Sequence, residues 1–153
     1  MHHVLFVCLG NICRSPMAEA IFRNLVKQRG WENQFIIDSA GTSGWHEGEA
    51  PHKGTVAELA SHHISTKGMM SRPLQAKDGE VFEYIVCMDN SNIKHAQEIL
   101  GGPSDKQLIR LLDLTAKKID VPDPYYTGDF KETYALCTLG CEALFNQIIK
   151  EQQ

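Results

Sequence analysis

The sequence has no apolar run that approaches the roughly 20 residues that a membrane-spanning helix requires. Its first residues also lack the basic and then apolar segment of a secretory signal. The net charge at pH 7 is only -4, so the chain has no basic surplus that would favour nucleic acid or an anionic membrane as a partner. We therefore expect a cytoplasmic protein with neither of these partners.

The cysteine spacing typical of zinc sites is missing too. Five cysteines, an odd number in a chain without a secretory signal, argue against a disulfide framework. Cys8 and Cys13 could form a zinc set with Cys137 and Cys141, but neither pair has the two-residue spacing of a zinc knuckle. The later pair instead fits the apolar face of a helix. We expect reduced thiols, with no metal and no cofactor.

Linkers, repeats and low-complexity tracts are absent as well. A chain of 153 residues with 42% hydrophobic content suffices for one domain, residues 1–153, with a substantial core. The expected strands are residues 4–7, 35–39, 83–88 and 107–111, and the expected helices are residues 16–29, 55–61, 90–100 and 130–149. This alternation predicts an α/β fold, a small doubly wound domain whose four-stranded parallel sheet carries helices on both faces.

Helix ends have signals of their own. Gly30 is placed to end the first helix, and Gly101, Gly102 and Pro103 are placed to end the third. Asp89 or the residue after it can cap the start of that third helix.

What the sequence does contain is a compact motif, residues 8–14, directly after the first expected strand. Gly10 and Asn11 tolerate left-handed backbone angles, Ser15 can cap a helix, and Pro16 fits the first helical turn. The motif should therefore wrap around a helix N-terminus, where backbone N–H groups and the helix dipole converge. In a doubly wound sheet this edge binds ligands. The motif predicts a binding site for an anion of phosphate shape.

Two side chains of the motif add chemistry. Arg14 offers a planar fork of donors to phosphate oxygens. Cys8 stands at a helix N-terminus beside this cation, where a thiol ionises far more readily than a free thiol and becomes a nucleophile at neutral pH. A Walker nucleotide loop is excluded because no Gly-Lys-Ser/Thr follows the glycine. A buried structural cysteine is the alternative, but the arginine, glycine, asparagine and helix cap together argue against it.

Cleavage of a phosphate ester also needs a proton for the departing oxygen. Asp123 stands between two prolines that stiffen its loop, and Tyr125 and Tyr126 add aromatic surface nearby. Asp-Pro is by itself a common turn dipeptide. The residues alone therefore leave open whether this segment is a plain turn or carries a general acid.

Taken together, these segments resemble the low-molecular-weight protein tyrosine phosphatases over nearly the whole chain. The resemblance rests on residues 7–19, 39–46, 87–89 and 123–126. It implies a phosphotyrosine phosphatase I-like fold that hydrolyses phosphotyrosine and aryl phosphate monoesters through a phosphocysteine intermediate. It also implies phosphotyrosine-containing proteins as substrates, and we expect a monomer or weak self-association.

The resemblance implies roles for individual residues. Cys8 is similar to the family's nucleophile, Arg14 to the group that clamps the transition state, and Asp123 to the general acid. The residues similar to the phosphate-binding loop are Leu9, Gly10, Asn11, Ile12, Cys13 and Arg14. Those similar to the supporting hydrogen-bond network are Asn11, Ser15 and Ser39. Those similar to the walls of the substrate slot are Trp45, Tyr125 and Tyr126.

One departure from the family lies near Gly68. The family carries a histidine after the second helix that contributes to the network around the loop asparagine, whereas residues 64–72 contain none. His62 and His63 precede this stretch and read as exposed residues at a helix end. We therefore expect weaker support for Asn11 without loss of activity.

Three alternatives share the loop. Arsenate reductases of this fold use a further cysteine pair on a mobile segment, whereas Cys87 here falls in an expected strand and the last two cysteines fall in a helix. Protein arginine phosphatases tend to have threonine where this chain has Ile12. A non-catalytic phosphate-binding module needs neither Cys8 nor Asp123.

Two hypotheses concern regulation. Cys13 lies five residues after Cys8 in one curved loop, so a reversible disulfide between them is conceivable, as is simple packing of Cys13 behind the loop. The family resemblance also suggests phosphorylation of Tyr125 or Tyr126.

Overall fold

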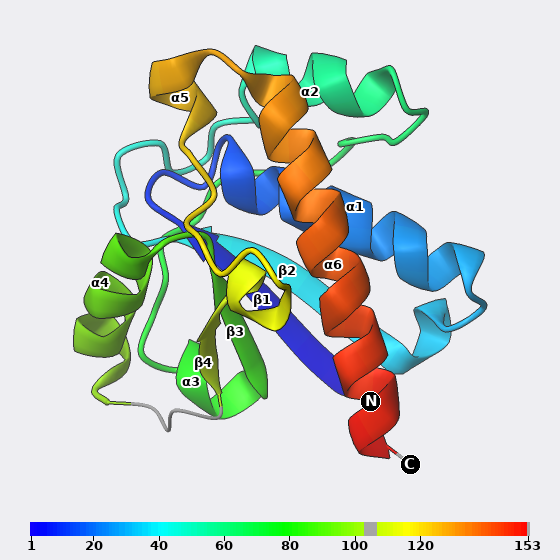
Figure 1. The fold of residues 1–153 in the computed structure, drawn as a ribbon. Helices are drawn as coiled ribbons and strands as arrows, with labels where there is room; N and C mark the ends of the chain where they lie inside the picture. The colour runs from blue at the N-terminus through cyan, green and yellow to red at the C-terminus, as the bar shows by residue number, and fades with distance from the viewer. Residues whose placement is uncertain (103–106, 153) are drawn as a thin grey trace.

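Four parallel strands form a sheet in the part of the chain that the computed structural model describes, residues 1–102 and 107–152 (Figure 1). Their order across the sheet is β2-β1-β3-β4, and each neighbouring pair is parallel. The strands are β1 (His2–Cys8), β2 (Phe35–Gly41), β3 (Tyr84–Cys87) and β4 (Leu108–Arg110). The predicted four-stranded parallel sheet is confirmed, with boundaries that move by one or two residues.

Helices occupy much of the remaining described chain. They are α1 (Arg14–Gln28), α2 (Lys53–Ala60), α3 (Asp78–Val81), α4 (Asn90–Leu100), α5 (Pro124–Thr127) and α6 (Phe130–Gln152). Two 3₁₀ turns complete the set, η1 (Glu32–Gln34) and η2 (Leu111–Leu114). The four longer helices match the predicted ones, whereas α3, α5 and the 3₁₀ turns are too short to leave a periodic pattern. Among these helices none is both long and apolar enough to cross a membrane.

Both faces of the sheet are buried. Consecutive side chains of a strand point to opposite faces, so β1 contributes to a separate core on each side. Val4 and Phe6 of β1 belong to a core that also contains residues of α1 and α6. Leu5 and Val7 belong to a second core that contains Phe82, directly after α3, and Ala96 of α4. Figure 1 shows α1 and α6 on one side of the sheet and α4 on the other. The prediction of helices on both faces is confirmed.

Glycine and asparagine take the backbone angles that end helices and turn loops. Gly30 follows α1 with φ 78°, and Gly101 ends α4 with φ 77°, as predicted. Pro103 lies outside the described residues. Of the two loop residues that tolerate left-handed backbone angles, Asn11 adopts one with φ 55°, whereas Gly10 does not. The asparagine can hold the left-handed angle because its short polar side chain is hydrogen-bonded locally.

The prediction that Ser15 caps the first helix is wrong. α1 begins at Arg14, one residue before Ser15, and its N-cap position is Cys13, whose side chain makes no capping hydrogen bond. Ser15 therefore lies inside the first turn. Its hydroxyl is directed at Cys8 instead of the helix backbone.

The sheet order sets the position of the motif. The chain leaves β1 toward β2 on one side and returns through β3 and β4 on the other, so the order reverses between β1 and β3. Ligands bind at such switch points, outside the carboxyl ends of the strands. Residues 8–14 follow β1 and Asp89 follows β3, so both lie at this point.

Candidate active site

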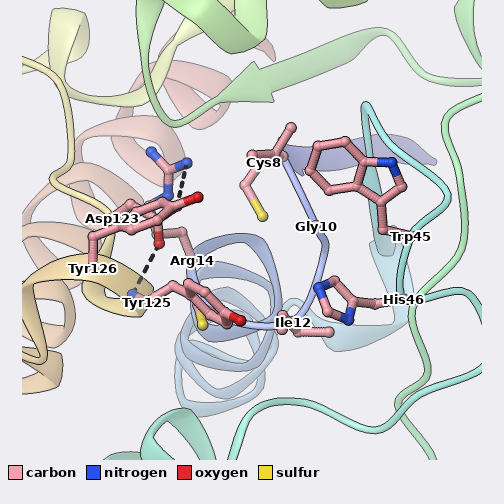
Figure 2. Close-up of a pocket in the computed structure, with 11 residues that line it drawn as sticks. Cys8, Gly10, Ile12, Arg14, Trp45, His46, Asp123, Tyr125 and Tyr126 are labelled. Atoms are coloured by element: carbon pink, nitrogen blue, oxygen red, sulfur yellow. Dashed lines mark hydrogen bonds and ion pairs between the residues drawn. The ribbon is translucent and has the colours of Figure 1, made fainter.

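A pocket opens at the carboxyl edge of the sheet, between the loop after β1, the segment after β2 and the start of α5 (Figure 2). The residues that line it are Cys8, Leu9, Gly10, Ile12, Cys13, Arg14, Trp45, His46, Asp123, Tyr125 and Tyr126. All three predicted catalytic residues and all three predicted slot walls are among them. His46 was not predicted.

The loop after β1 turns its carbonyl groups away from the pocket. The carbonyl of Cys8 accepts a hydrogen bond from Thr42 N at 2.9 Å, and that of Ile12 accepts one from His52 N at 2.7 Å. The carbonyl of Gly10 accepts from Ser71 Oγ at 3.0 Å. Because the C=O and N–H of a trans peptide point in opposite directions, these bonds turn the neighbouring N–H groups toward the pocket. The loop is thus a cradle of donors for an anion.

Cys8 ends β1 and is only 3% exposed. Its Sγ accepts a hydrogen bond from Asn11 N at 3.3 Å and lies 3.0 Å from Ser15 Oγ. Ser15 in the first turn of α1 thus contacts the Cys8 sulfur, in the position that the family resemblance implied for it.

The predicted supporting network is assembled around Asn11. Its Nδ2 donates to Ser15 Oγ at 2.8 Å and to Ser39 Oγ at 2.9 Å. Its Oδ1 accepts from Arg72 N at 3.0 Å, so donors and acceptor are all satisfied without a histidine. The expected weaker support for Asn11 is therefore not seen in its hydrogen bonds. His62 instead stacks on Tyr134, outside this network.

The His62 ring stacks on the ring of Tyr134 with 3.7 Å between centroids, and His62 Nε2 also contacts Glu58.

Arg72 holds its own backbone in place through its guanidinium. This group donates to Asp38 Oδ2 at 3.1 Å and to Asp78 Oδ2 at 3.0 Å. The two carboxylates thereby fix the backbone N–H that Asn11 uses.

Glu19 is a member of the network that the sequence did not identify. Ser39 Oγ donates to its Oε1 at 2.6 Å, and Arg23 Nε donates to its Oε2 at 2.8 Å. Glu19 is 5% exposed, and this burial raises its pKa against the opposing effect of Ser39 and Arg23. A signal was present, because Glu19 stands four residues after buried Ser15 on the inner face of α1.

Arg14 projects from the first turn of α1 and is 3% exposed. Its Nη1 donates to Asp89 Oδ2 at 2.6 Å and to the Val121 carbonyl at 3.0 Å. Burial opposes its charge, but nearby Cys8, Asp89 and Asp123 more than offset burial and raise its pKa. The guanidinium is held in one orientation and stays charged.

Asp89 was predicted only as a helix cap. Its Oδ1 does cap α4, accepting from Asn92 N at 2.7 Å within a capping box. Its other oxygen holds Arg14. One carboxylate thus joins the start of α4 to the floor of the pocket, which no local pattern reveals.

Asp123 lies at the start of α5, where the sequence left open a plain turn. Its Oδ1 accepts from Tyr125 N at 3.0 Å, and Pro124 occupies the first helical position. Its Oδ2 lies 3.4 Å from Arg14 Nη2. The carboxylate is partly open to the pocket, so it can reach a bound ligand.

Large aromatic side chains form the rim. Trp45 is 75% exposed and Tyr126 is 76% exposed, and Tyr125 packs on Tyr126 with ring centroids 5.3 Å apart. Exposed apolar surface of this size beside a pocket marks a binding site. His46 covers Gly10 closely, since a Cβ at Gly10 would lie 3.0 Å from His46 Cδ2. A Cβ at this position would require the His46 ring to shift slightly.

All five cysteines fall within the described residues and are free. Burial raises the pKa of Cys13 and of Cys137 to about 12, and raises that of Cys87 and Cys141 as well. These four are neutral thiols at physiological pH. In the described part of the chain no cluster of three or more His, Cys, Asp or Glu side chains could hold a metal ion.

Comparisons with known proteins agree with this geometry. The sequence profile of the family described as low molecular weight phosphotyrosine protein phosphatase matches residues 3–153. Low molecular weight protein-tyrosine-phosphatase YfkJ of Bacillus subtilis is 48% identical over 155 residues, which cover 100% of this chain and 99% of the relative. The crystal structure of YfkJ matches with a TM-score of 0.96 and covers 100% of this chain and 98% of that chain.

Two further solved structures are similar. A protein tyrosine phosphatase from Entamoeba histolytica with Hepes in the active site has a TM-score of 0.90 and 31% identity, covering 100% of both chains. DARP, a drosophila arginine phosphatase, has a TM-score of 0.85 and 34% identity, covering 95% of this chain and 96% of that chain.

Proposed function

The chain belongs to the low molecular weight phosphotyrosine protein phosphatase family, and within this family we propose that Cys8, Arg14 and Asp123 carry out its hydrolysis of phosphotyrosine. One observation carries the assignment. Cys8 and Arg14 belong to the loop of residues 8–14 and Asp123 to a segment remote in sequence, yet all three line one pocket, with Arg14 Nη2 3.4 Å from Asp123 Oδ2.

In the first step the Cys8 thiolate attacks phosphorus in line. The loop N–H groups and Arg14 hold the equatorial oxygens, where charge develops in the transition state. Asp123 protonates the departing phenolate oxygen. Asp89 and the Val121 carbonyl support this step, because they hold the Arg14 fork in one orientation.

In the second step water releases phosphate from phosphocysteine. Asp123, now a carboxylate, accepts a proton from the attacking water. The leaving group is the Cys8 thiolate, and the Ser15 hydroxyl and Asn11 N–H stabilise it as the S–P bond breaks.

Release of phosphate from a phosphotyrosine peptide tests these roles. We expect Cys8→Ser to have no measurable turnover and Asp123→Asn to lose on the order of 10² to 10⁴ in rate. Asp129→Asn is a matched control, because Asp129 caps a turn at the start of α6 through Glu132 N and lies outside the pocket. Wild-type activity of Asp123→Asn, or equal losses in both aspartate variants, would contradict the assignment.

We further propose phosphotyrosine, not phosphoarginine, as the preferred substrate. Ile12 presents an apolar side chain to the pocket beside Tyr125 and Trp45, which suits an aromatic ring better than a guanidinium. The likeness to an arginine phosphatase makes the comparison necessary. Matched peptides with phosphotyrosine or phosphoarginine should differ in kcat/KM by about tenfold or more in favour of tyrosine. The opposite order would redirect the assignment.

An arsenate reductase would need a second cysteine pair that can move to Cys8. Cys87 is instead a fully buried residue of β3, and Cys137 and Cys141 are fully buried in α6. This placement supports hydrolysis over reduction. Arsenate reduction faster than phosphotyrosine hydrolysis would overturn it.

We propose reversible oxidation as a means of regulation. Cys8 and Cys13 line the same pocket, and a disulfide between them would protect an oxidised Cys8 from further oxidation. After treatment with peroxide and then reductant, wild type should regain more activity than Cys13→Ser.

We also propose phosphorylation of Tyr125 or Tyr126, because both side chains are exposed and accessible to a kinase.

We propose that residues 1–153 act as one catalytic domain, supported by α6 packing on α1 beside the loop. We also propose a monomer or weak self-association, since one chain supplies all three proposed catalytic residues. Five free cysteines suit the reducing cytoplasm.

A further inference from the structure

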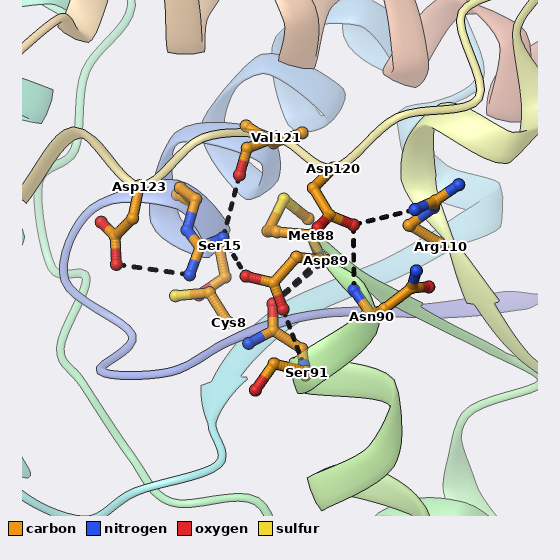
Figure 3. Close-up of polar contacts among 12 residues, drawn as sticks. Cys8, Ser15, Met88, Asp89, Asn90, Ser91, Arg110, Asp120, Val121 and Asp123 are labelled. Atoms are coloured by element: carbon orange, nitrogen blue, oxygen red, sulfur yellow. Dashed lines mark hydrogen bonds and ion pairs between the residues drawn. The ribbon is translucent and has the colours of Figure 1, made fainter. Parts of the chain in front are cut away.

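The segment that carries Asp123 has no regular secondary structure between η2 and α5, yet it must hold a carboxylate at a fixed place (Figure 3). Val121 fixes one point of it. Its N–H donates to the Met88 carbonyl at 2.9 Å, its carbonyl accepts from Arg14, and it is 1% exposed. Val121 is therefore one anchor of the segment, two residues before Asp123.

Asp120 supplies a second anchor. Its Oδ1 accepts from Asn90 N at 3.0 Å and from Arg110 Nη1 at 2.8 Å. Asn90 is the first residue of α4 and directly follows Asp89, which holds Arg14. A carboxylate is favoured at this helix N-terminus by the helix dipole. Figure 3 shows Asp120 between the start of α4 and Arg110.

Arg110 is braced by other contacts. Its Nη2 donates to Asp113 Oδ1 at 2.7 Å and to the Lys118 carbonyl at 3.0 Å. Lys118 has φ 47°, a left-handed angle that is unfavourable for lysine and that these contacts hold. The guanidinium therefore ties β4 to both ends of the short stretch from Lys118 to Asp120.

We propose that Asp120 is a positioning residue for the reaction, which sets the place of the Asp123 carboxylate by fastening its segment to α4 and Arg110. The inference rests on the proposed role of Asp123 as the general acid. Val121 and Pro122 alone separate the two aspartates, and proline restricts the backbone, so a shift at Asp120 passes on to Asp123. A small misplacement of a proton donor lowers the rate strongly.

The leaving group distinguishes positioning from mere stability. Nitrophenolate departs without much help, whereas phenolate and tyrosine, with pKa values near 10, need the proton from Asp123. Exposed ion pairs stabilise proteins little, and the Asp120 side chain is 50% exposed, so Asp120→Ala should unfold at nearly the wild-type temperature.

The experiment compares kcat/KM for phenyl phosphate and p-nitrophenyl phosphate in wild type, Asp120→Ala and Asp120→Asn. We expect Asp120→Ala to lose about tenfold for phenyl phosphate and under about threefold for p-nitrophenyl phosphate. Asp120→Asn keeps an acceptor for Asn90 N and should recover most of the loss. Asp113→Ala is the matched control, because it removes another carboxylate of Arg110 without touching the Asn90 contact.

An equal loss for both substrates, no loss for either, or the same selective loss in Asp113→Ala overturns the role of Asp120. Asp123→Asn in the same series distinguishes failure of the Asp120 inference from failure of the proposed function. If Asp123→Asn shows no dependence on the leaving group, the acid assignment fails, and the inference fails with it. If only Asp120→Ala lacks that dependence, the acid assignment stands and the inference alone is wrong.

Discussion

Individual residues in and behind the pocket owe their roles to their hydrogen-bond partners, and Glu19, which is buried behind the loop, is the clearest case. It has no place in the reaction steps, yet its carboxylate accepts from Ser39, which accepts from Asn11, which donates to Ser15 beside Cys8. A buried carboxylate at the end of such a chain orients every hydroxyl in it. It also carries a penalty, because burial disfavours its charge.

This penalty predicts a pH-dependent effect of Glu19→Gln. Burial raises the pKa of Glu19 in the folded state, so its stabilising contribution is full below the unfolded value near 4.3 and is lost as the pH rises through the folded value. Glutamine keeps the acceptor for Ser39 without the charge. The free energy of unfolding at pH 7.5 should therefore exceed that of wild type, and the difference should shrink toward pH 4.

Urea unfolding at several pH values measures this difference. Glu47→Gln is the control, because Glu47 is exposed. A Glu19→Gln variant that is less stable than wild type at every pH would show that the charge on Glu19 is favourable and that the argument from burial is wrong.

Single elements carry constraints that propensity alone misjudges, and α6 illustrates this. Gly140 lies within this 23-residue helix, where a glycine normally weakens helix formation. Here a Cβ would lie 2.3 Å from Leu111 Cγ on η2. The glycine lets α6 approach η2, the turn that precedes the Asp123 segment.

Gly140→Ala sets these two effects against each other. Helix propensity favours alanine by about 1 kcal/mol. Overpacking against the fully buried side chain of Leu111 typically costs about 1 to 3 kcal/mol, and the contact here is far below any real Cβ distance, so we expect net destabilisation. Thermal unfolding of Gly140→Ala beside Leu139→Ala, an exposed position on the same helix, checks the prediction. A higher Tm for Gly140→Ala would show that η2 yields freely.

The whole molecule assembles the pocket from segments that are remote in sequence. The sheet order places the ends of β1 and β3 side by side, and the segment of Val121 runs along the end of β3 through the Met88 carbonyl. Arg14 then reaches partners from both, Asp89 and Asp123. The anion site therefore exists only in the folded chain.

It follows that inorganic phosphate should stabilise the fold by mass action. A ligand that binds only the folded state at 100 times its Kd adds about 2.7 kcal/mol to the free energy of unfolding. Tm should rise with phosphate in wild type and much less in Arg14→Met, with sodium chloride at equal ionic strength as the control. The same rise in both proteins would mean that phosphate acts outside this pocket.

Features encoded by neighbouring residues were predictable from the sequence. The apolar run of β1 with burial on both faces, the glycines that end α1 and α4, and the loop of residues 8–14 all depend on contacts a few residues apart. The backbone geometry that joins Cys8, Asn11 and Arg14 is short-range, so its chemistry could be inferred before the fold was known.

Other features required the tertiary structure. The charge partner of Arg14 is Asp89, the hydrogen-bond partner of Ser39 is Glu19, and the anchor of the Asp123 segment is Asp120 on Asn90. Judged from its neighbours in the sequence alone, each of these carboxylates would be a helix cap, a charge on a helix surface or a turn residue. By itself the sequence determined the nucleophilic loop and the class of fold, because periodicity and turn residues act locally. Only the tertiary structure decided which carboxylates support that loop, because electrostatic and hydrogen-bond partners are chosen by distance in space.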